Sequence, residues 1–197
     1  MPVDQPDYEH RTRRRVGLFI AIVATGALAV AGVVASLALF TDSDALGANA
    51  FTTGTIILGL SPTTALLTSS ALMPGDNVNG TLVVTNSGTG ALRYAMSSSS
   101  TNTDGKALAT QMTMIVKTLG TSCAAFDGTP LYTGALSAAA FGSNAAGAQA
   151  GDRTLAAAAS ETLCFRASLA LATGNTFQNA TTTTTFTFDS EQTANNP

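Results

Sequence analysis

The chain has 197 residues, of which 45% are apolar and only 11% are charged, and its net charge is −3. Disordered chains are far richer in charge, and nucleic-acid binding needs clustered lysine and arginine, so both classes are excluded. The one dense basic cluster directly precedes a long apolar run and consists of Arg11, Arg13, Arg14 and Arg15. This pairing indicates a targeting signal.

The apolar run covers residues 16–40. As a helix rising about 1.5 Å per residue, it could cross a hydrocarbon core of about 30 Å. Ser36 and Ala38 fit the small −3 and −1 positions of a cleavage site, so we expect a signal peptide over residues 1–38 and a mature start at Leu39. An uncleaved membrane anchor, or cleavage after residue 50, is the alternative.

Catalytic side chains are scarce in the exported part. The single histidine, His10, lies inside the predicted signal peptide, which excludes Ser-His-Asp, Cys-His and HExxH sites from the exported part. Asp42 with Asp44, and Asp189 with Glu191, are spaced two apart, but they flank strand ends, where solvated acids are expected. We therefore predict no enzyme, no catalytic residue, no metal site and no cofactor.

The two cysteines, Cys123 and Cys164, both lie in the exported part. An even number of cysteines in an exported chain favours a disulfide over a metal site or free thiols. The bridge would close a loop of roughly 40 residues and contribute roughly 4 kcal/mol. There is no CxxC spacing, so redox chemistry is not indicated.

Short apolar stretches, interrupted by Gly, Thr, Ser, Asn and Asp, fill the chain after residue 40. This pattern predicts an all-β fold, an antiparallel β-sandwich over residues 55–192, followed by a flexible tail at 193–197. The expected strands lie at residues 55–60, 65–70, 78–85, 92–96, 112–119, 161–171 and 181–189.

The clearest predicted unit is a hairpin. Its first strand follows a turn at residues 73–76, where Pro74 sets φ and Gly75 supplies a positive φ. Residues 86–90 then reverse the chain. Alternating apolar side chains mark the expected inward face of both strands: Leu82, Val84, Leu92, Tyr94 and Met96.

The remaining segments are less regular. Residues 106–111 could hold one helical turn, and the Ala- and Gly-rich stretch 135–160 lacks the large apolar side chains that would dock a long helix. We expect a surface excursion there, with a short strand near residues 153–156. Alternation predicts a second set of inward side chains in the last two strands: Leu163, Phe165, Ala167, Leu169, Leu171, Phe186 and Phe188.

Three short motifs occur in a distinctive order. They are Leu39-Phe40-Thr41-Asp42-Ser43-Asp44, the segment Asn49-Ala50-Phe51-Thr52-Thr53-Gly54-Thr55-Ile56, and Met73-Pro74-Gly75-Asp76 followed by Asn86-Ser87-Gly88. In this order and spacing the chain resembles the TasA/camelysin family of exported bacterial biofilm-matrix proteins, and looks most like its actinobacterial members. The similarity runs from the signal through about residue 96, and more loosely through the Thr-rich end.

The resemblance implies a jelly-roll-like sandwich, processed by a dedicated ER-type signal peptidase and secreted to the extracellular matrix or cell surface. It implies fibres of identical copies, each donating an N-terminal strand to its neighbour, with a membrane contact only through the signal. Residues 39–54 and the first strand would form the donor, with Ile57 as the candidate for the side chain that docks inward. The donor residues are Phe40, Phe51, Thr55, Ile56, Ile57 and Leu58.

Two other functions stay open. A monomeric cell-surface adhesion or carbohydrate-binding module would place its function in the loops of the same sandwich. A secreted enzyme would need carboxylates that converge in a cleft. The protease label attached to camelysin disagrees with the lack of zinc-binding histidines in the exported part.

Overall fold

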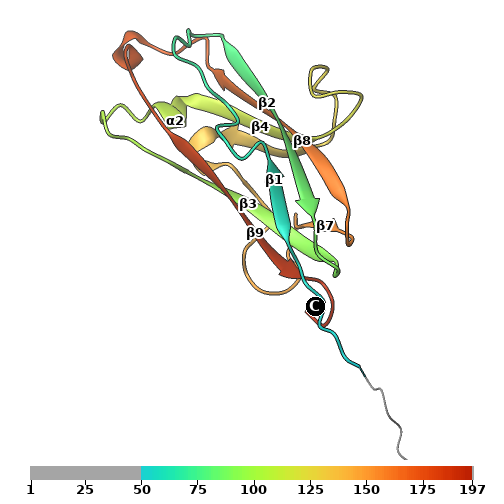
Figure 1. The fold of residues 1–197 in the computed structure, drawn as a ribbon. Helices are drawn as coiled ribbons and strands as arrows, with labels where there is room; N and C mark the ends of the chain where they lie inside the picture. Colours follow the sequence, from blue (N-terminus) through green and yellow to red (C-terminus); the bar gives the residue numbers. More distant parts are fainter. Residues whose placement is uncertain (1–49, 197) are drawn as a thin grey trace, which may run out of the picture. The chain divides into compact units, whose positions relative to one another are not determined.

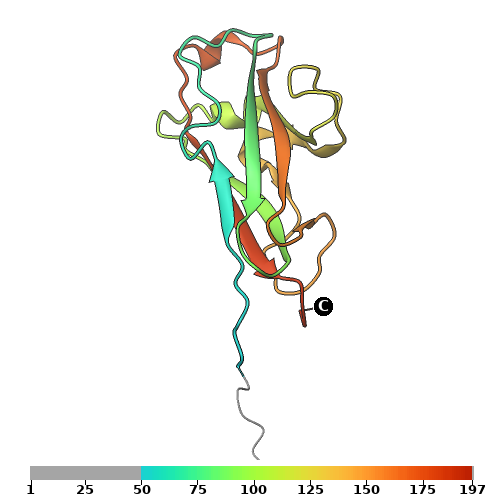
Figure 2. The same ribbon diagram turned by 45° about the vertical axis from the view of Figure 1, so that its right-hand side comes forward.

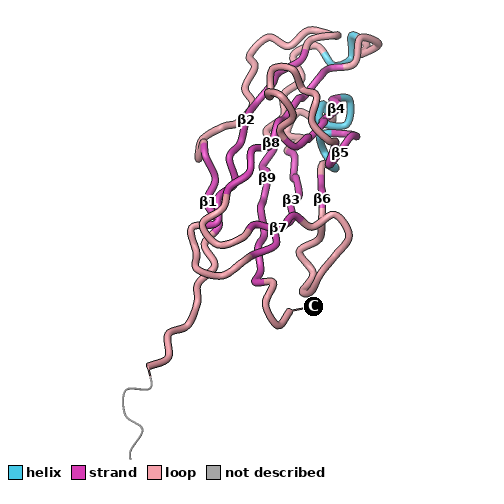
Figure 3. Tube along the Cα trace, turned by 90° about the vertical axis from the view of Figure 1, so that its right-hand side faces the viewer, coloured by secondary structure: helices cyan, strands magenta, loops and turns pink. Residues whose placement is uncertain are grey.

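The computed structural model describes residues 50–196, and a compact unit begins at Thr52. The predicted signal helix, the cleavage site at Ser36, Ala38 and Leu39, and donor residue Phe40 lie outside the described residues. Within them the chain forms strands and only very short helices (Figures 1 and 3). All strand pairs are antiparallel, which confirms the all-β prediction.

The first sheet has five strands in the order β1-β2-β8-β4-β5. Its long central strands are β2 (Asn77–Asn86) and β8 (Ser160–Leu169), which pair with each other (Figure 2). β4 (Met112–Thr118) pairs with the other side of β8. The edges are β1 (Leu58–Ser61) and β5 (Pro130–Ala135).

The second sheet is built around β3 (Leu92–Ser100). β9 (Thr184–Gln192) pairs with β3 along its whole length. β6 (Ala140–Phe141) and β7 (Arg153–Leu155) pair with β3 at separate points, one after the other. Because β9 occupies one side of β3, the two short strands share the other side.

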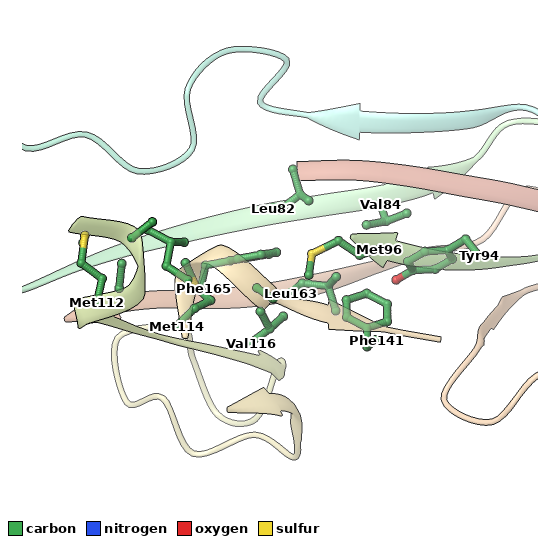
Figure 4. Close-up of a cluster of buried hydrophobic side chains, with 14 of the residues drawn as sticks. Leu82, Val84, Tyr94, Met96, Met112, Met114, Val116, Phe141, Leu163 and Phe165 are labelled. Atoms are coloured by element: carbon green, nitrogen blue, oxygen red, sulfur yellow. The ribbon is translucent and has the colours of Figure 1, made fainter. Parts of the chain in front are cut away.

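The core lies between the two sheets (Figure 4). Tyr94 of β3 packs edge-on against Phe141 of β6, with ring centroids 6.0 Å apart. Phe165 of β8 meets Phe186 of β9 across the sheets at 5.5 Å. The predicted inward residues of the strands at 78–85 and 92–96 are buried, as are those of β8 up to Leu169. In β4 the buried side chains are Met112, Met114 and Val116.

The predicted hairpin is wrong. β2 and β3 do not pair; they lie in different sheets and face each other across the core. Residues 86–90 are therefore a crossing between sheets. Alternation correctly identified the inward side chains, but it cannot distinguish a strand that lies beside its neighbour from one that faces it.

Other strand predictions were confirmed with shifted ends or were wrong. The segment at 65–70 is not a strand, although Leu66 and Leu67 pack against the core, and β5 and β6 were not predicted. Leu171, predicted to face inward, is 82% exposed because β8 ends at Leu169. The strands predicted at 112–119 and 181–189 correspond to β4 and β9.

The predicted local turns are present. Asp76 N donates to Met73 O (2.9 Å), and Gly75 has φ +94°, the conformation that favours glycine. The helical turn expected at 106–111 is α2 (Leu108–Gln111). Two further turns are short 3-10 helices, η1 (Leu136–Ala138) and η2 (Asn175–Phe177).

The Ala- and Gly-rich excursion covers part of the outer face of the second sheet. Arg93 and Ala95 point away from the core, yet they are 6% and 5% exposed. A Cβ on Gly142 would lie 3.0 Å from the Ala95 Cβ, and Gly147 N donates to Glu191 (3.3 Å). Small side chains allow this close approach. β7 is the short strand expected near residues 153–156.

Candidate functional site: the docking edge of the N-terminal segment

The segment before β1 is held by backbone hydrogen bonds. Thr55 O accepts from the N–H groups of Thr89 (2.8 Å) and Gly90 (2.9 Å), and Ile57 O accepts from Ser87 N (2.8 Å). Thr55 N donates to Thr89 Oγ1 (2.9 Å). The crossing at 86–90 therefore forms a cradle that continues the edge of β2 and receives residues 55–57, and we call it the docking cradle.

Asn86 gives the docking cradle its shape. Its side chain is completely buried, and its Nδ2 donates to Gly90 O (2.8 Å), Ala156 O (3.0 Å) and Leu155 O (3.3 Å). Its Oδ1 accepts from Gly88 N (2.9 Å). The buried amide is thus fully satisfied, and it ties the crossing to the end of β7. None of these bonds involves the N-terminal segment.

Gly88 allows the two backbones to approach. A Cβ at this position would lie 2.3 Å from Thr55 O and 2.7 Å from the Ile56 Cα. No residue with a side chain fits there unless the segment moves. The Asn86-Ser87-Gly88 motif identified in the sequence is therefore the contact surface for the N-terminal segment.

The donor residues predicted from the sequence divide into two groups. Ile56 and Leu58 are half-buried and pack against the core, whereas Ile57 is 51% exposed. The assignment of Ile57 as the inward side chain is therefore wrong; the alternation is shifted by one residue, and Ile56 docks inward. Phe51 is 95% exposed.

The disulfide predicted from the sequence is present between Cys123 and Cys164. It attaches the loop after β4 to the outer face of the first sheet. In the same loop Phe126 lies under the guanidinium of Arg166, 3.9 Å from its ring centroid, and beside Lys117 Nζ at 4.9 Å. These contacts keep Phe126 6% exposed although it is on the outer side of the sheet.

A polar link crosses between the two sheets near the docking cradle. The Tyr94 hydroxyl donates to Glu161 Oε1 (2.6 Å), and Arg153 pairs with Glu161 at 2.5 Å. Burial, reinforced by the hydrogen bond to Glu161, raises the pKa of Tyr94, so its hydroxyl stays protonated and donates. The hydrogen bond to Glu161 also raises the pKa of Arg153. The group is a structural link between β3, β7 and β8.

The loops at the other end of the domain are joined by Asp104. Its carboxylate accepts from Lys106 N (3.0 Å) and Thr181 N (2.7 Å). The backbone hydrogen bond from Lys106 is the largest cause that lowers the pKa of this carboxyl, followed by the bond from Thr181. The pKa of Asp127 is also lowered, chiefly by its hydrogen bond with Thr121.

Acid should therefore destabilise the domain. A carboxyl whose folded pKa lies below its unfolded value stabilises the fold above the unfolded pKa, about 3.9 for Asp, and loses that contribution as the pH falls through the folded pKa. We expect the urea midpoint to fall between about pH 4 and pH 2. Asp104→Asn should show a shallower fall, and an identical pH profile for the variant and the parent would contradict this assignment.

Candidate metal ligands do not gather in the part of the chain that the structure describes. No group of three His, Cys, Asp or Glu side chains within residues 50–196 is arranged to hold a metal ion. Both cysteines are used in the disulfide, and Glu191 is paired with Arg93 at 3.3 Å. In the same part of the chain, no helix is long and apolar enough to cross a bilayer.

The fold and the site define a class of protein: an antiparallel β domain with an N-terminal segment docked along one sheet edge by its backbone. The model of the family described as camelysin metallo-endopeptidase matches residues 11–113, more than half of the chain, and the chain belongs to this TasA-related camelysin family. The match includes the N-terminal segment, β1, β2 and the docking cradle. No curated protein matches the chain.

Proposed function

We propose that this chain is a secreted structural subunit of extracellular biofilm-matrix or surface fibres, built from identical copies by donor-strand exchange, and not an enzyme. Its domain would be the jelly-roll-like type that the family resemblance implies. Signal peptidase would cleave after Ala38 and leave residues 39–54 ahead of the β domain. The family supports an exported, matrix-type protein, because its TasA members are structural.

The observation that carries the proposal is the docking cradle, whose shaping bonds do not involve the N-terminal segment. The segment at 55–61 is held mainly by backbone bonds and by three half-buried side chains, Ile56, Leu58 and Leu60. A neighbouring copy presents an identical segment, which could make the same contacts in trans. Exchange of identical contacts between copies costs little free energy, and backbone pairing at a sheet edge is a common mode of strand addition.

The connection after β1 suits an exchange. Residues 62–76 separate β1 from β2 and form no strand. A long connection of this kind can open without breaking the ladder between β2 and β8, which holds nine residue pairs from Asn77↔Ser168 to Thr85↔Ser160. The body of the domain would therefore stay folded while β1 moves to a neighbour.

A cysteine pair can distinguish the two arrangements. Gly59 lies opposite Thr85, and a Cβ on Gly59 would be 3.9 Å from the Thr85 Cβ, within the range of a disulfide. In Gly59→Cys/Thr85→Cys, docking within one chain gives an internal crosslink and a monomer band on a non-reducing gel. Exchange in assembled material gives a ladder of covalent oligomers that reducing agent removes.

The single variants Gly59→Cys and Thr85→Cys are the matched controls. Neither can form the internal crosslink, and a chain with one added cysteine can be linked to only one other chain, so neither can give covalent oligomers larger than a dimer. Assemblies visible by electron microscopy that yield only monomer bands from the double variant would refute exchange at this edge. A protein that forms no assemblies and binds sugars saturably would instead be an adhesion or carbohydrate-binding module.

A further inference from the structure

The second sheet has a free edge at β9. Thr101 N donates to Thr183 O and Thr193 N to Ala91 O, so the odd-numbered residues of β9 direct their backbone groups toward β3. In an antiparallel ladder these directions alternate, so the even-numbered residues direct their N–H and C=O groups away from β3. Within residues 50–196, β9 pairs with no strand other than β3. The unpaired edge consists of Thr184, Phe186, Phe188 and Ser190.

This edge has little of the usual protection. Edge strands are commonly blunted by lysine, proline, a bulge or a covering loop. β9 contains neither lysine nor proline, and its register with β3 is continuous from Leu92↔Gln192 to Ser100↔Thr184. Thr185 and Thr187 on its outer face are exposed and uncharged. A straight edge whose charged side chains, Asp189 and Glu191, both lie in its C-terminal half is suited to pair with another strand.

We propose that β9 of a second copy of this chain pairs with it in antiparallel orientation, around a two-fold axis at Thr187. Thr184 then pairs with Ser190 of the second copy, and Phe186 pairs with Phe188. All four residues with free backbone groups gain hydrogen-bonded partners, about eight bonds in total. The sheets of the two copies become one continuous sheet.

The side chains are self-complementary in this register. Phe186 and Phe188 are half-buried at the rim of the core. Phe186 of each copy would lie opposite Phe188 of the other copy. Cross-strand aromatic pairs are among the favourable contacts in antiparallel sheets. The interface would therefore cover the apolar rim that β9 leaves partly exposed.

Charge and hydrogen bonding favour this register over two others. With the axis at Thr187, Asp189 lies opposite Thr185 and Glu191 lies opposite Thr183, so no two carboxylates face each other. An axis at Asp189 would oppose two carboxylates, which is unfavourable. An axis at Phe188 would use the carbonyl of Gln192, which already accepts from Asn196 Nδ2 at 3.3 Å.

The proposed contact is independent of strand exchange. It lies on the second sheet, whereas the docking cradle extends the edge of the first, and it joins two copies by an identical surface on each. Exchange adds copies end to end along a chain of donors; β9 pairing would join copies side by side. Either one could fail without affecting the other.

Single cysteines on the exported protein test the register. Residues at the two-fold axis form a non-hydrogen-bonded pair with Cα atoms about 4.5 Å apart, within disulfide range. Thr187→Cys should therefore give a covalent dimer on a non-reducing gel. Thr185→Cys is the matched control, because it lies on the same exposed face. The two cysteines of a Thr185→Cys pair would lie about 13 Å apart, so this variant should form no covalent dimer. Equal crosslinking of the two variants, or none with Thr187→Cys, would overturn the proposal.

Charged substitutions at the two-fold axis provide a second readout. Thr187→Lys and Thr187→Glu each place like charges together at the axis, and each should reduce association at least tenfold in sedimentation equilibrium. A mixture of the two variants places opposite charges there and should restore heterodimers. Because Thr187 is exposed, circular dichroism should show an unchanged fold. Association that is unaffected by either variant would argue against β9 pairing.

Discussion

Replacing Cys123 and Cys164 together by alanine is expected to lower the free energy of unfolding by about 4 kcal/mol. The bridge spans 41 positions of the chain, and the loss reflects the additional freedom that the unfolded chain gains without it. The folded state should change little, because Phe126 stays packed under Arg166 and Lys117. Urea unfolding of both proteins at neutral pH measures the difference.

Reduction supplies the control for this variant. Reducing agent should lower the stability of the parent to that of the double variant, and it should leave the variant unchanged. Intact mass after alkylation shows whether the thiols were paired. A loss below about 1 kcal/mol, or free thiols in the unreduced parent, would show that the bridge does not stabilise the exported protein.

Gly88→Ala is expected to displace the N-terminal segment from the docking cradle, at a cost of about 3 kcal/mol. The new methyl group would lie 2.3 Å from Thr55 O and 2.7 Å from the Ile56 Cα. Both are backbone atoms, which no side-chain rotation can move aside. The amide protons of Ser87, Thr89 and Gly90, which donate to the segment, should exchange with solvent much faster.

Gly90→Ala is the matched control, two residues further along the same crossing. Its Cβ would lie 3.6 Å from Thr55 O and 3.8 Å from Ile56 Cγ2, which are ordinary contacts. Hydrogen exchange by NMR and thermal unfolding should therefore separate the two variants clearly. Equal effects at Gly88 and Gly90 would mean that the close approach of the two backbones does not hold the segment.

Much of the local structure could be read from side-chain types. The turn at Pro74 and Gly75 requires only φ values that those two residues supply. Burial in β4 and β8 follows from strict alternation, because a strand points successive side chains to opposite faces. The disulfide could be predicted because two cysteines in an exported chain allow only one pairing.

The shape of the docking cradle could not be predicted from residue types alone. Asn86-Ser87-Gly88 has the composition of a turn, and a hairpin turn is the simplest interpretation. Its actual shape depends on Asn86 reaching carbonyl groups of residues 155 and 156, about 70 positions away. The assignment of Ile57 failed for the same reason, because register at the sheet edge is set by the partners Ser87 and Thr89.

The all-β class, the inward faces of the main strands, the paired cysteines and the family follow from the sequence alone, because they depend on periodicity, composition and short motifs. Which strands are neighbours could be learned only from the folded domain. Leu82 and Tyr94 can be equally buried in one sheet or in two, because burial requires an apolar partner above the strand and not a particular strand beside it. The free edge at β9 and the cradle for the N-terminal segment are consequences of that pairing, and pairing between distant strands is set by the packing of the whole core.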